Sequence, residues 1–286
     1  MILKSYAKLN LYLEVLGLRK DNYHNIRTVF ERISLYDTIV LKPRRDKKIK
    51  IYSDSQKIPL DESNLAFKSA SLLQRTFNIN KGVDIKIIKR IPVGSGMGGG
   101  SSNAACVLLG LNKLWRMGLG KKALAGLAAR IGSDSPFFIY EVPFALGESR
   151  GERIKPLKSL FKAKLRHVLA VPKLAVSTPL IYKKWDKSRL TLPKSSVKML
   201  LSAIRKNDLS STGEALFNDL QPVTAKIYPE VLVTRRKLLS LGLSATLMSG
   251  SGPTVFGIAS SKKMAQFAYR NLKKSKELKV FAVETV

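Results

Sequence analysis

The sequence predicts an α+β fold in two domains, because strand-like and helix-like segments alternate without a regular βαβ repeat. The pattern restarts after Arg150-Gly151-Glu152, so the expected domains are residues 1–152 and 153–286. A chain of 286 residues is long enough for two domains, and 45% hydrophobic content excludes global disorder. A glycine-rich segment between a strand and a helix indicates a ligand site in the first domain.

The first domain is expected to contain antiparallel strands followed by helices. Alternating apolar and polar residues predict the strands, and apolar residues at helical spacing predict the helices. The expected strands are Leu3–Gly17, Thr28–Ile33, Thr38–Lys42, Ile49–Tyr52 and Val83–Ile91, and the expected helices are Asn64–Phe77, a buried helix through Ala104–Leu111, and Lys121–Ile131.

The second domain is expected to surround its helices with strands. A polar stretch, Lys183–Lys194, precedes the first helix, and the second helix has an early proline with Gly242 directly after its end. The expected strands are Leu165–Val171, Ser244–Met248, Thr254–Ala259 and Lys279–Val283, and the expected helices are Ser196–Lys206, Pro229–Leu241 and Lys262–Lys273.

The glycine-rich segment has the composition of a loop that binds a polyphosphate. It reads Pro92-Val93-Gly94-Ser95-Gly96-Met97-Gly98-Gly99-Gly100-Ser101-Ser102-Asn103. Five of the seven residues from 94 to 100 are glycine, and no acidic residue lies between Asp84 and Asp134. Backbone without Cβ atoms lets amide N–H groups converge on one anion, and the following helix N-terminus adds its dipole. Ser101, Ser102 or Asn103 is expected to cap that helix.

Two common nucleotide-binding loops are excluded by the residues around these glycines. Gly94 to Gly99 fits the dinucleotide pattern, but no Asp or Glu follows about twenty residues later to bind a ribose. A Walker A loop needs Lys and then Ser or Thr after its last glycine, whereas Gly99 is followed by Gly100-Ser101. The segment therefore predicts a different kind of phosphate loop.

A second glycine turn, Met248-Ser249-Gly250-Ser251-Gly252-Pro253, lies between two expected strands. It has two interpretations. It is either a hairpin turn or a loop of the second domain that closes over the ligand of the first loop.

Charge and cysteine content restrict the class of protein less than the motifs do. The net charge of +31 raises a nucleic-acid hypothesis, but the Lys and Arg residues are scattered and no nucleic-acid motif accompanies them. A positive field that concentrates small anionic substrates, or a general basic bias, explains the same charge. The single Cys106 excludes an internal disulfide, and no long apolar run or signal-like start is present, which predicts a cytoplasmic protein without membrane partners. The oligomeric state is not predicted.

Three separated segments resemble, in order, the three motifs of the GHMP small-molecule kinases: Ala7-Lys8-Leu9-Asn10-Leu11, Pro92 to Ser102, and Ser249-Gly250-Ser251-Gly252-Pro253. Three more resemble the branch that phosphorylates 4-diphosphocytidyl-2-C-methyl-D-erythritol: Asp21-Asn22-Tyr23-His24, Gly132-Ser133-Asp134-Ser135-Pro136-Phe137-Phe138, and Thr178-Pro179-Leu180-Ile181-Tyr182. The resemblance implies a two-domain GHMP kinase fold, with an N-terminal ribosomal-protein-like ATP domain, a C-terminal α+β substrate domain and a cleft between them.

The resemblance also implies roles for individual residues. Lys8 and Asp134 would form the catalytic pair, with Asp134 accepting the proton of the C2 hydroxyl. Without the resemblance, residue type and position favour a helix cap for Asp134 and a solvated strand residue for Lys8. ATP would contact residues 92–102 together with Asn64 and Lys89. The substrate would contact Asn10, Tyr23, His24, Thr178, Tyr182, Gly250 and Ser251, with the tyrosines stacking on cytosine and His24 reading its edge.

Mg²⁺ is expected with ATP, held by phosphates and by Ser102, although no dedicated acidic ligand is visible in the sequence. Two alternatives stay open. One is another GHMP kinase of the homoserine or mevalonate type, and the other is a basic RNA-binding protein, because the implied N-terminal fold also occurs in a ribosomal protein.

Overall fold

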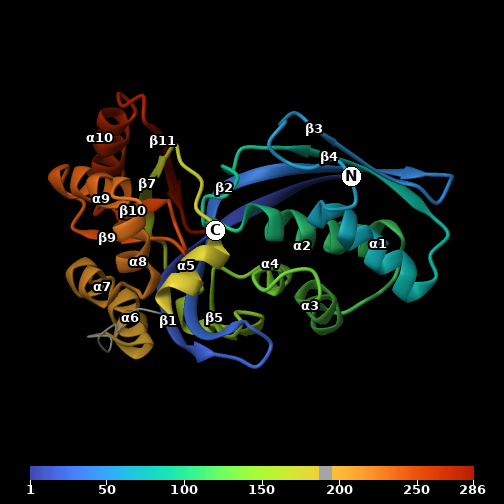
Figure 1. The fold of residues 1–286 in the computed structure, drawn as a ribbon, viewed down its shortest axis with the longest axis horizontal. Helices are drawn as coiled ribbons and strands as arrows, with labels where there is room; N and C mark the ends of the chain where they lie inside the picture. The colour runs from blue at the N-terminus through green and yellow to red at the C-terminus, as the bar shows by residue number, and fades with distance from the viewer. Residues whose placement is uncertain (187–194) are drawn as a thin grey trace.

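The computed structural model describes residues 1–186 and 195–286 (Figure 1). The first half of the chain forms a sheet with helices packed along it. Its strands are β1 (Ile2–Leu18), β2 (His24–Arg44), β3 (Ile49–Ser53), β4 (Gly82–Ile88), β5 (Phe144–Ser149) and β6 (Arg153–Pro156), and its helices are α1 (Leu65–Phe77), α2 (Gly99–Leu114), α3 (Lys121–Ala129) and α4 (Ser135–Tyr140).

The second half forms a smaller sheet surrounded by helices. The strands of this sheet are β7 (Arg166–Pro172), β9 (Ala245–Met248), β10 (Val255–Ile258) and β11 (Leu278–Glu284), whereas the short strand β8 (Phe217–Asn218) joins the first sheet. The helices of the second half are η1 (Lys158–Leu160), α5 (Thr178–Trp185), α6 (Val197–Arg205), α7 (Leu209–Ala215), α8 (Leu220–Ile227), α9 (Glu230–Ser240) and α10 (Lys262–Leu272). No helix among the described residues is long and apolar enough to span a membrane.

These strands form two sheets, of which the first is mixed and the second is antiparallel. The first has seven strands, with β3-β4-β2-β1-β8 in order, β5 paired with β2, and β6 paired with β5; among the described strands, only the β3–β4 and β1–β8 pairs of this sheet are parallel. The second has four antiparallel strands in the order β11-β7-β10-β9. Helix α2 packs against β1 and β2, and α1 packs against α2 and β3 (Figure 1). The predicted α+β class is confirmed.

The long pair of strands β1 and β2 corrects one prediction. The sequence predicts two strands, Thr28–Ile33 and Thr38–Lys42, but the chain runs through both as the single strand β2. The register shifts where Tyr6 pairs with Tyr36 and Ala7 pairs with Ile33, so the predicted gap is a bulge inside one strand. Another shift follows Asn10, and these two irregularities bracket Lys8 on β1.

The start of helix α2 corrects a second prediction. The helix begins at Gly99, five residues before the expected Ala104, and its N-cap is Gly98 with φ of 67° and no side-chain hydrogen bond. None of the expected caps serves, because Ser101, Ser102 and Asn103 lie inside the first turn. The first N–H groups of α2 are therefore not capped by a side chain, as an anion site requires.

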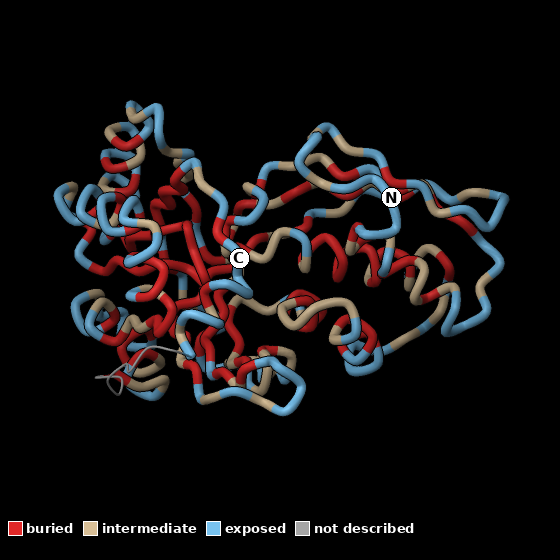
Figure 2. The backbone as a smooth tube through the Cα atoms, viewed as in Figure 1, coloured by how far each residue is buried: buried red, intermediate tan, exposed pale blue. Residues whose placement is uncertain are grey.

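The two sheets share an apolar core. One buried cluster joins Leu9 and Val29 of the first sheet to Leu169 and Phe256 of the second. The C-terminus returns to the first sheet, where Thr285 forms a bridge with Ile33. Figure 2 shows buried residues concentrated along α2 and through the second sheet, while hairpin tips and outer helices are exposed. The predicted boundary at residue 152 falls between β5 and β6, which pair with each other.

Candidate active site

A cleft of about 1090 Å³ is lined by residues of both halves of the chain. The loop of residues 92–98, called the glycine loop below, lies between β4 and α2, and α5 and the β9–β10 turn contribute from the second half. The predicted site residues that line the cleft are Lys8, Asn10, Tyr23, His24, Asn64, Lys89, Pro92, Val93, Gly94, Ser95, Gly96, Gly98, Gly99, Gly100, Ser101, Asp134, Thr178, Tyr182, Gly250 and Ser251.

The backbone of the glycine loop takes conformations that favour glycine. Gly94, Gly96 and Gly98 have φ of 68°, 75° and 67°. A Cβ on Gly96 would lie 2.4 Å from the carbonyl oxygen of Ser249, and a Cβ on Gly98 would lie 3.2 Å from the side chain of Lys8. The glycines therefore allow the loop to pass close to both the second half of the chain and β1.

The second glycine turn is a hairpin turn, and it also lies against the glycine loop. It connects the antiparallel strands β9 and β10, so it is a hairpin turn. It also contacts the glycine loop: Ser249 Oγ donates to the carbonyl oxygen of Gly96 at 3.2 Å, and Thr254 Oγ1 donates to that of Ser95 at 2.6 Å. These hydrogen bonds tie the two halves of the chain together at the edge of the cleft.

Lys8 and Asp134 meet in the cleft, with Lys8 Nζ 3.4 Å from Asp134 Oδ2. The Lys8 side chain is 4% exposed and that of Asp134 is 31% exposed, so the carboxylate is open to the cleft and the ammonium is not. Asp134 occupies the N-cap position of α4 but makes no capping hydrogen bond. Lys8 also donates to Asn10, whose amide donates to Thr28 Oγ1 at 2.8 Å. Asp134 is thus not used as a helix cap, and Lys8 is not a solvated strand residue.

Two predicted ATP-binding residues lie away from the cleft. Met97 is fully buried, and its carbonyl accepts the backbone N–H of Lys8 at 3.1 Å. Ser102 is 2% exposed, and its hydroxyl accepts a 2.7 Å hydrogen bond from Ser5. Consecutive helical residues face different sides, so Ser101 lines the cleft while Ser102 faces β1. Both residues contact β1 behind the loop.

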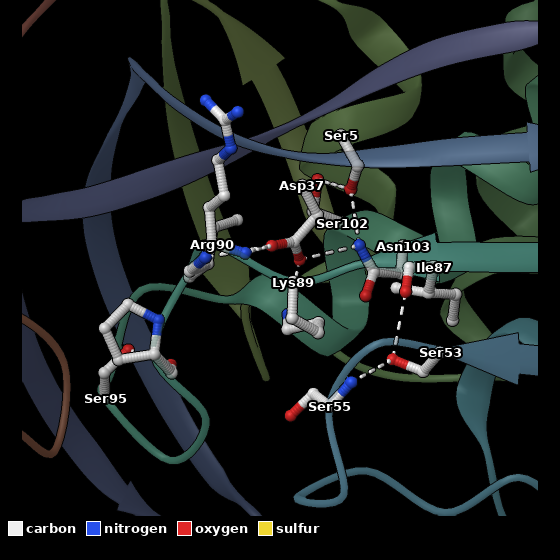
Figure 3. Close-up of polar contacts among 12 residues, drawn as sticks. Ser5, Asp37, Ser53, Ser55, Ile87, Lys89, Arg90, Ser95, Ser102 and Asn103 are labelled. Carbon is white, nitrogen blue, oxygen red and sulfur yellow. Dashed lines mark hydrogen bonds and ion pairs between the residues drawn. The ribbon is translucent and has the colours of Figure 1, made fainter.

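Asn64 and Lys89 line the cleft and also make structural contacts. Asn64 caps α1, since its side chain accepts the N–H of Ala66 at 2.9 Å, as its sequence position predicts. The ammonium of Lys89 forms an ion pair with the buried Asp37 (Figure 3). These two contacts hold Asn64 and Lys89 in place in the wall of the cleft.

Tyr23, His24 and Tyr182 line one part of the cleft, called the aromatic end below. The ring of His24 packs on Tyr182 with centroids 4.9 Å apart, and its Nε2 makes a 2.7 Å hydrogen bond with Asp186. Burial, with a contribution from the charge of Asp134, raises the pKa of Tyr182, which keeps the phenol neutral. The half-exposed Tyr23 has the guanidinium of Arg150 4.8 Å from its ring. Each of the two tyrosines thus already has a ring or cation partner.

Several residues that contribute to this site were not assigned a binding role from the sequence, among them Asp37, Asn103, Arg150 and Asp186. Asn103 directly follows the predicted loop and was expected only as a cap. Asp186 ends helix α5, whose single buried residue is Ile181, so the sequence carries little helical periodicity there. Asp37 lies inside a strand with its carboxylate pointing inward, a position that sequence pattern assigns to apolar residues.

Comparison with known proteins identifies the family of this chain. The model of the GHMP kinases N terminal domain matches residues 64–141, and that of the GHMP kinases C terminal domain matches residues 200–277. A protein of Alkaliphilus metalliredigens named 4-diphosphocytidyl-2-C-methyl-D-erythritol kinase is 40% identical over 270 residues, covering 94% of this chain and 91% of that protein. A protein of Geobacillus kaustophilus with the same name is 42% identical over 273 residues, covering 95% and 92%.

A solved structure agrees with the sequence relatives. The crystal structure of a 4-(cytidine 5'-diphospho)-2C-methyl-D-erythritol kinase superposes with a TM-score of 0.82 at 32% identity, and the alignment covers 100% of both chains. The glycine loop, the Lys8–Asp134 pair and the aromatic end of the cleft all lie within the matched length. The chain belongs to the 4-diphosphocytidyl-2-C-methyl-D-erythritol kinase family of the GHMP kinases.

Proposed function

We propose that the cleft transfers the γ-phosphoryl group of ATP to the C2 hydroxyl of 4-diphosphocytidyl-2-C-methyl-D-erythritol. The observation that carries this proposal is the Lys8–Asp134 pair, which lies beside the glycine loop in the same cleft. The triphosphate binds at the loop and the α2 N-terminus, and the cytidine binds at the aromatic end. The acceptor hydroxyl then lies between them, beside Asp134.

Asp134 acts as the general base in this proposal. Its carboxylate makes no capping hydrogen bond and is partly exposed to the cleft, so an oxygen is free to accept the proton of the attacking hydroxyl. Lys8 orients the carboxylate from 3.4 Å, while Asn10 holds Lys8 from the other side. A tertiary hydroxyl is a crowded nucleophile, and phosphoryl transfer depends mainly on positioning and charge stabilisation, which this rigid arrangement supplies.

Mg²⁺ fits the site as a partner of the phosphates. Among the described residues, no group of three or more His, Cys, Asp or Glu is arranged to hold a metal ion. The ion would therefore bind mainly to phosphate oxygens, which is usual for Mg²⁺ with ATP, and it would neutralise charge on the transferred group. Ser101 replaces Ser102 as the serine that contributes a ligand, because the Ser102 hydroxyl is bonded to Ser5 in the core.

The base is recognised by His24 together with the two tyrosines. A carboxylate only accepts hydrogen bonds, so the contact with Asp186 places a proton on His24 Nε2. Nδ1 has no hydrogen-bond partner among residues 1–186 and 195–286, and His24 lines the cleft. In the neutral ring Nδ1 is an acceptor, which matches the exocyclic amine of cytosine and opposes the O4 of uracil.

The two domains supply different parts of the proposed site. Residues 1–152 supply the glycine loop and both catalytic residues, and residues 153–286 supply α5 and the second glycine turn. Substrate contacts come from both, because Tyr23 and His24 precede the boundary and Tyr182 follows it. The cytoplasmic location expected from the sequence stays a prediction.

A panel of acceptors tests this function. With ATP and Mg²⁺, the protein should phosphorylate 4-diphosphocytidyl-2-C-methyl-D-erythritol, and phosphorus NMR should place the new phosphate on the C2 oxygen. Homoserine and mevalonate should give no product above background. Phosphorylation of either one at a rate matching the cytidyl substrate would contradict the proposal, as would RNA binding at physiological salt without kinase activity.

A further inference from the structure

A single buried carboxylate contacts the chain on both sides of the glycine loop: the segment before it and the helix after it. Asp37 lies in β2 and is 0% exposed. Its Oδ1 accepts the backbone N–H groups of Arg90 at 2.7 Å and Ile91 at 2.9 Å, immediately before the loop begins at Pro92. Figure 3 shows Asp37 between this segment and the helix that follows the loop.

The other oxygen of Asp37 contacts the far side of the loop. Oδ2 accepts a hydrogen bond of 3.0 Å from Asn103 Nδ2, in the first turn of α2, and forms an ion pair with the ammonium of Lys89. Asn103 Nδ2 also donates to Ser5 Oγ at 2.8 Å, and Ser5 donates to Ser102. The network therefore joins β1, β2 and the first turn of α2.

The Lys89 ammonium held by Asp37 reaches the place where the loop becomes a helix. Its Nζ would be 3.2 Å from a Cβ on Gly99, the first residue of α2. Lys89 lines the cleft, although its side chain is only 7% exposed. Asp37 thus fixes a cation beside the N–H groups that face the phosphates.

We propose that Asp37 is a positioning residue for the ATP triphosphate, an inference that rests on the ATP site proposed above. Its two oxygens set the spacing between the strand that enters the glycine loop and the helix that leaves it. The same carboxylate fixes the Lys89 ammonium at the α2 N-terminus. A buried carboxylate is costly unless several donors satisfy it, and here four donors from both sides of the loop do so. Small displacements of such a loop weaken binding strongly.

The test compares Asp37→Asn with Glu31→Gln. Both are isosteric changes of a carboxylate that is 0% exposed in β2, but Glu31 contacts His167 and not the loop. Asparagine keeps one oxygen for the N–H groups of Arg90 and Ile91, while its NH₂ opposes the donors Lys89 and Asn103. Calorimetric titration with ATP, without acceptor, should show Kd raised about tenfold or more in Asp37→Asn, from the loss of hydrogen bonds to a charged group. Glu31→Gln should bind ATP as the native protein does.

The two variants also separate positioning from stability. Both should lower Tm, but only Asp37→Asn should raise Kd and KM for ATP while leaving KM for the cytidyl substrate unchanged. Equal ATP affinity in folded Asp37→Asn and native protein would overturn this inference alone. Absence of ATP binding in the native protein would overturn the proposed ATP site with it.

Asn103→Ala provides the second variant, which removes one arm of the network without leaving a charge unpaired. It should raise the ATP Kd by a few-fold, about what one lost hydrogen bond gives. If Asn103 acts through Asp37, the double variant should bind ATP no more weakly than Asp37→Asn does. Fully additive losses would show that Asn103 acts independently, and an Asn103→Ala protein with native affinity would contradict the inference even if Asp37→Asn fails to fold.

Discussion

Two acid–base pairs lie on opposite faces of the same strands, β1 and β2. Lys8 and Leu9 pair with Arg32 and Glu31 across the two strands. Lys8 faces the cleft and meets Asp134, whereas Glu31 faces the second sheet and meets His167 on β7, with Nε2 2.9 Å from Oε1. One step along a strand reverses the side of the sheet, so neighbouring positions serve different environments.

The carboxylates of Glu31 and Asp134 differ in their exposure and in the number of their hydrogen-bond and ion-pair partners. Glu31 and His167 are both 0% exposed, and Thr285 Oγ1 donates to the same carboxylate at 2.6 Å, so this cluster joins both sheets and the C-terminus. Asp134 is 31% exposed and bonded by a single lysine. A sealed pair holds the sheets together, while an open one can take a proton from a substrate. Burial therefore distinguishes Glu31, which has a structural role, from Asp134, the proposed general base.

The largest expected effect is on catalysis by Asp134→Asn. Loss of the general base should slow phosphoryl transfer by roughly 10²–10⁴-fold. Because Asp134 makes no capping hydrogen bond, Tm should stay close to the native value. Single-turnover rates with saturating ATP measure the chemical step, and calorimetry checks that ATP still binds. An unchanged chemical step would make Asp134 structural, like Glu31.

Glu31→Gln should show the opposite pattern. Replacing the charged acceptor of His167 and Thr285 should lower the free energy of unfolding by about 1.5–3 kcal/mol, the range for hydrogen bonds to a charged group. The single-turnover rate should match that of the native enzyme. Denaturant unfolding measures the stability, and the single-turnover assay measures the rate. A lower rate without a lower stability would contradict the structural role of Glu31.

Tyr182→Ala examines the aromatic end of the cleft. Affinity for the cytidyl substrate should fall by about 1–3 kcal/mol, the range for stacking one base on an aromatic ring. The variant also removes the ring on which His24 packs, at 4.9 Å between centroids, so no compensation from His24 is expected. The KM for ATP should change little. Lysines in the same helix offer a control, and Lys184→Ala, which does not line the cleft, should behave as native.

The smallest expected effect concerns Asp219, whose exposure of 7% lies between those of Glu31 and Asp134. It accepts the N–H of Val15 at 2.7 Å, and burial raises its pKa above the ordinary 3.8. A folded state that binds the proton more tightly loses stability as pH rises from 3.8 through the raised pKa. Asp219→Asn should therefore be slightly more stable than native protein at pH 7, and the difference in Tm should shrink toward the acidic limit. A constant difference across pH would show that ionisation of Asp219 is not the cause.

The sequence predicts most elements whose apolar pattern is strong. Strand β1 and helices α1, α6, α9 and α10 lie within a few residues of their expected bounds, because each buries a regular face. Helices α4, α5, α7 and α8, the 3₁₀ helix η1, and strands β5, β6 and β8 were not predicted. Each is short, and α5 buries only Ile181, so periodicity carries little information there. Part of the polar stretch Lys183–Lys194 lies outside the described residues.

The candidate site was predicted where it depends on local sequence and missed where it depends on tertiary contacts. Glycine spacing and the resemblance together pointed to the loop, Lys8 and Asp134. No local pattern indicates that Asp37 reaches the loop from β2, or that Asp186 reaches His24, because these partners are far apart in sequence. The start of α2 at Gly99, which the sequence pattern does not indicate, decides that Ser101 lines the cleft while Ser102 faces β1.

The most direct test of the proposed function is kcat/KM for 4-diphosphocytidyl-2-C-methyl-D-erythritol and for its uridine analogue in the native enzyme. If His24 is fixed by Asp186 and presents an acceptor to the base, the uridine analogue leaves a buried polar group mismatched. The cytidine substrate should then be preferred by at least about a hundredfold. Equal kcat/KM values for the two substrates would contradict base recognition at this end of the cleft, and with it the proposed substrate.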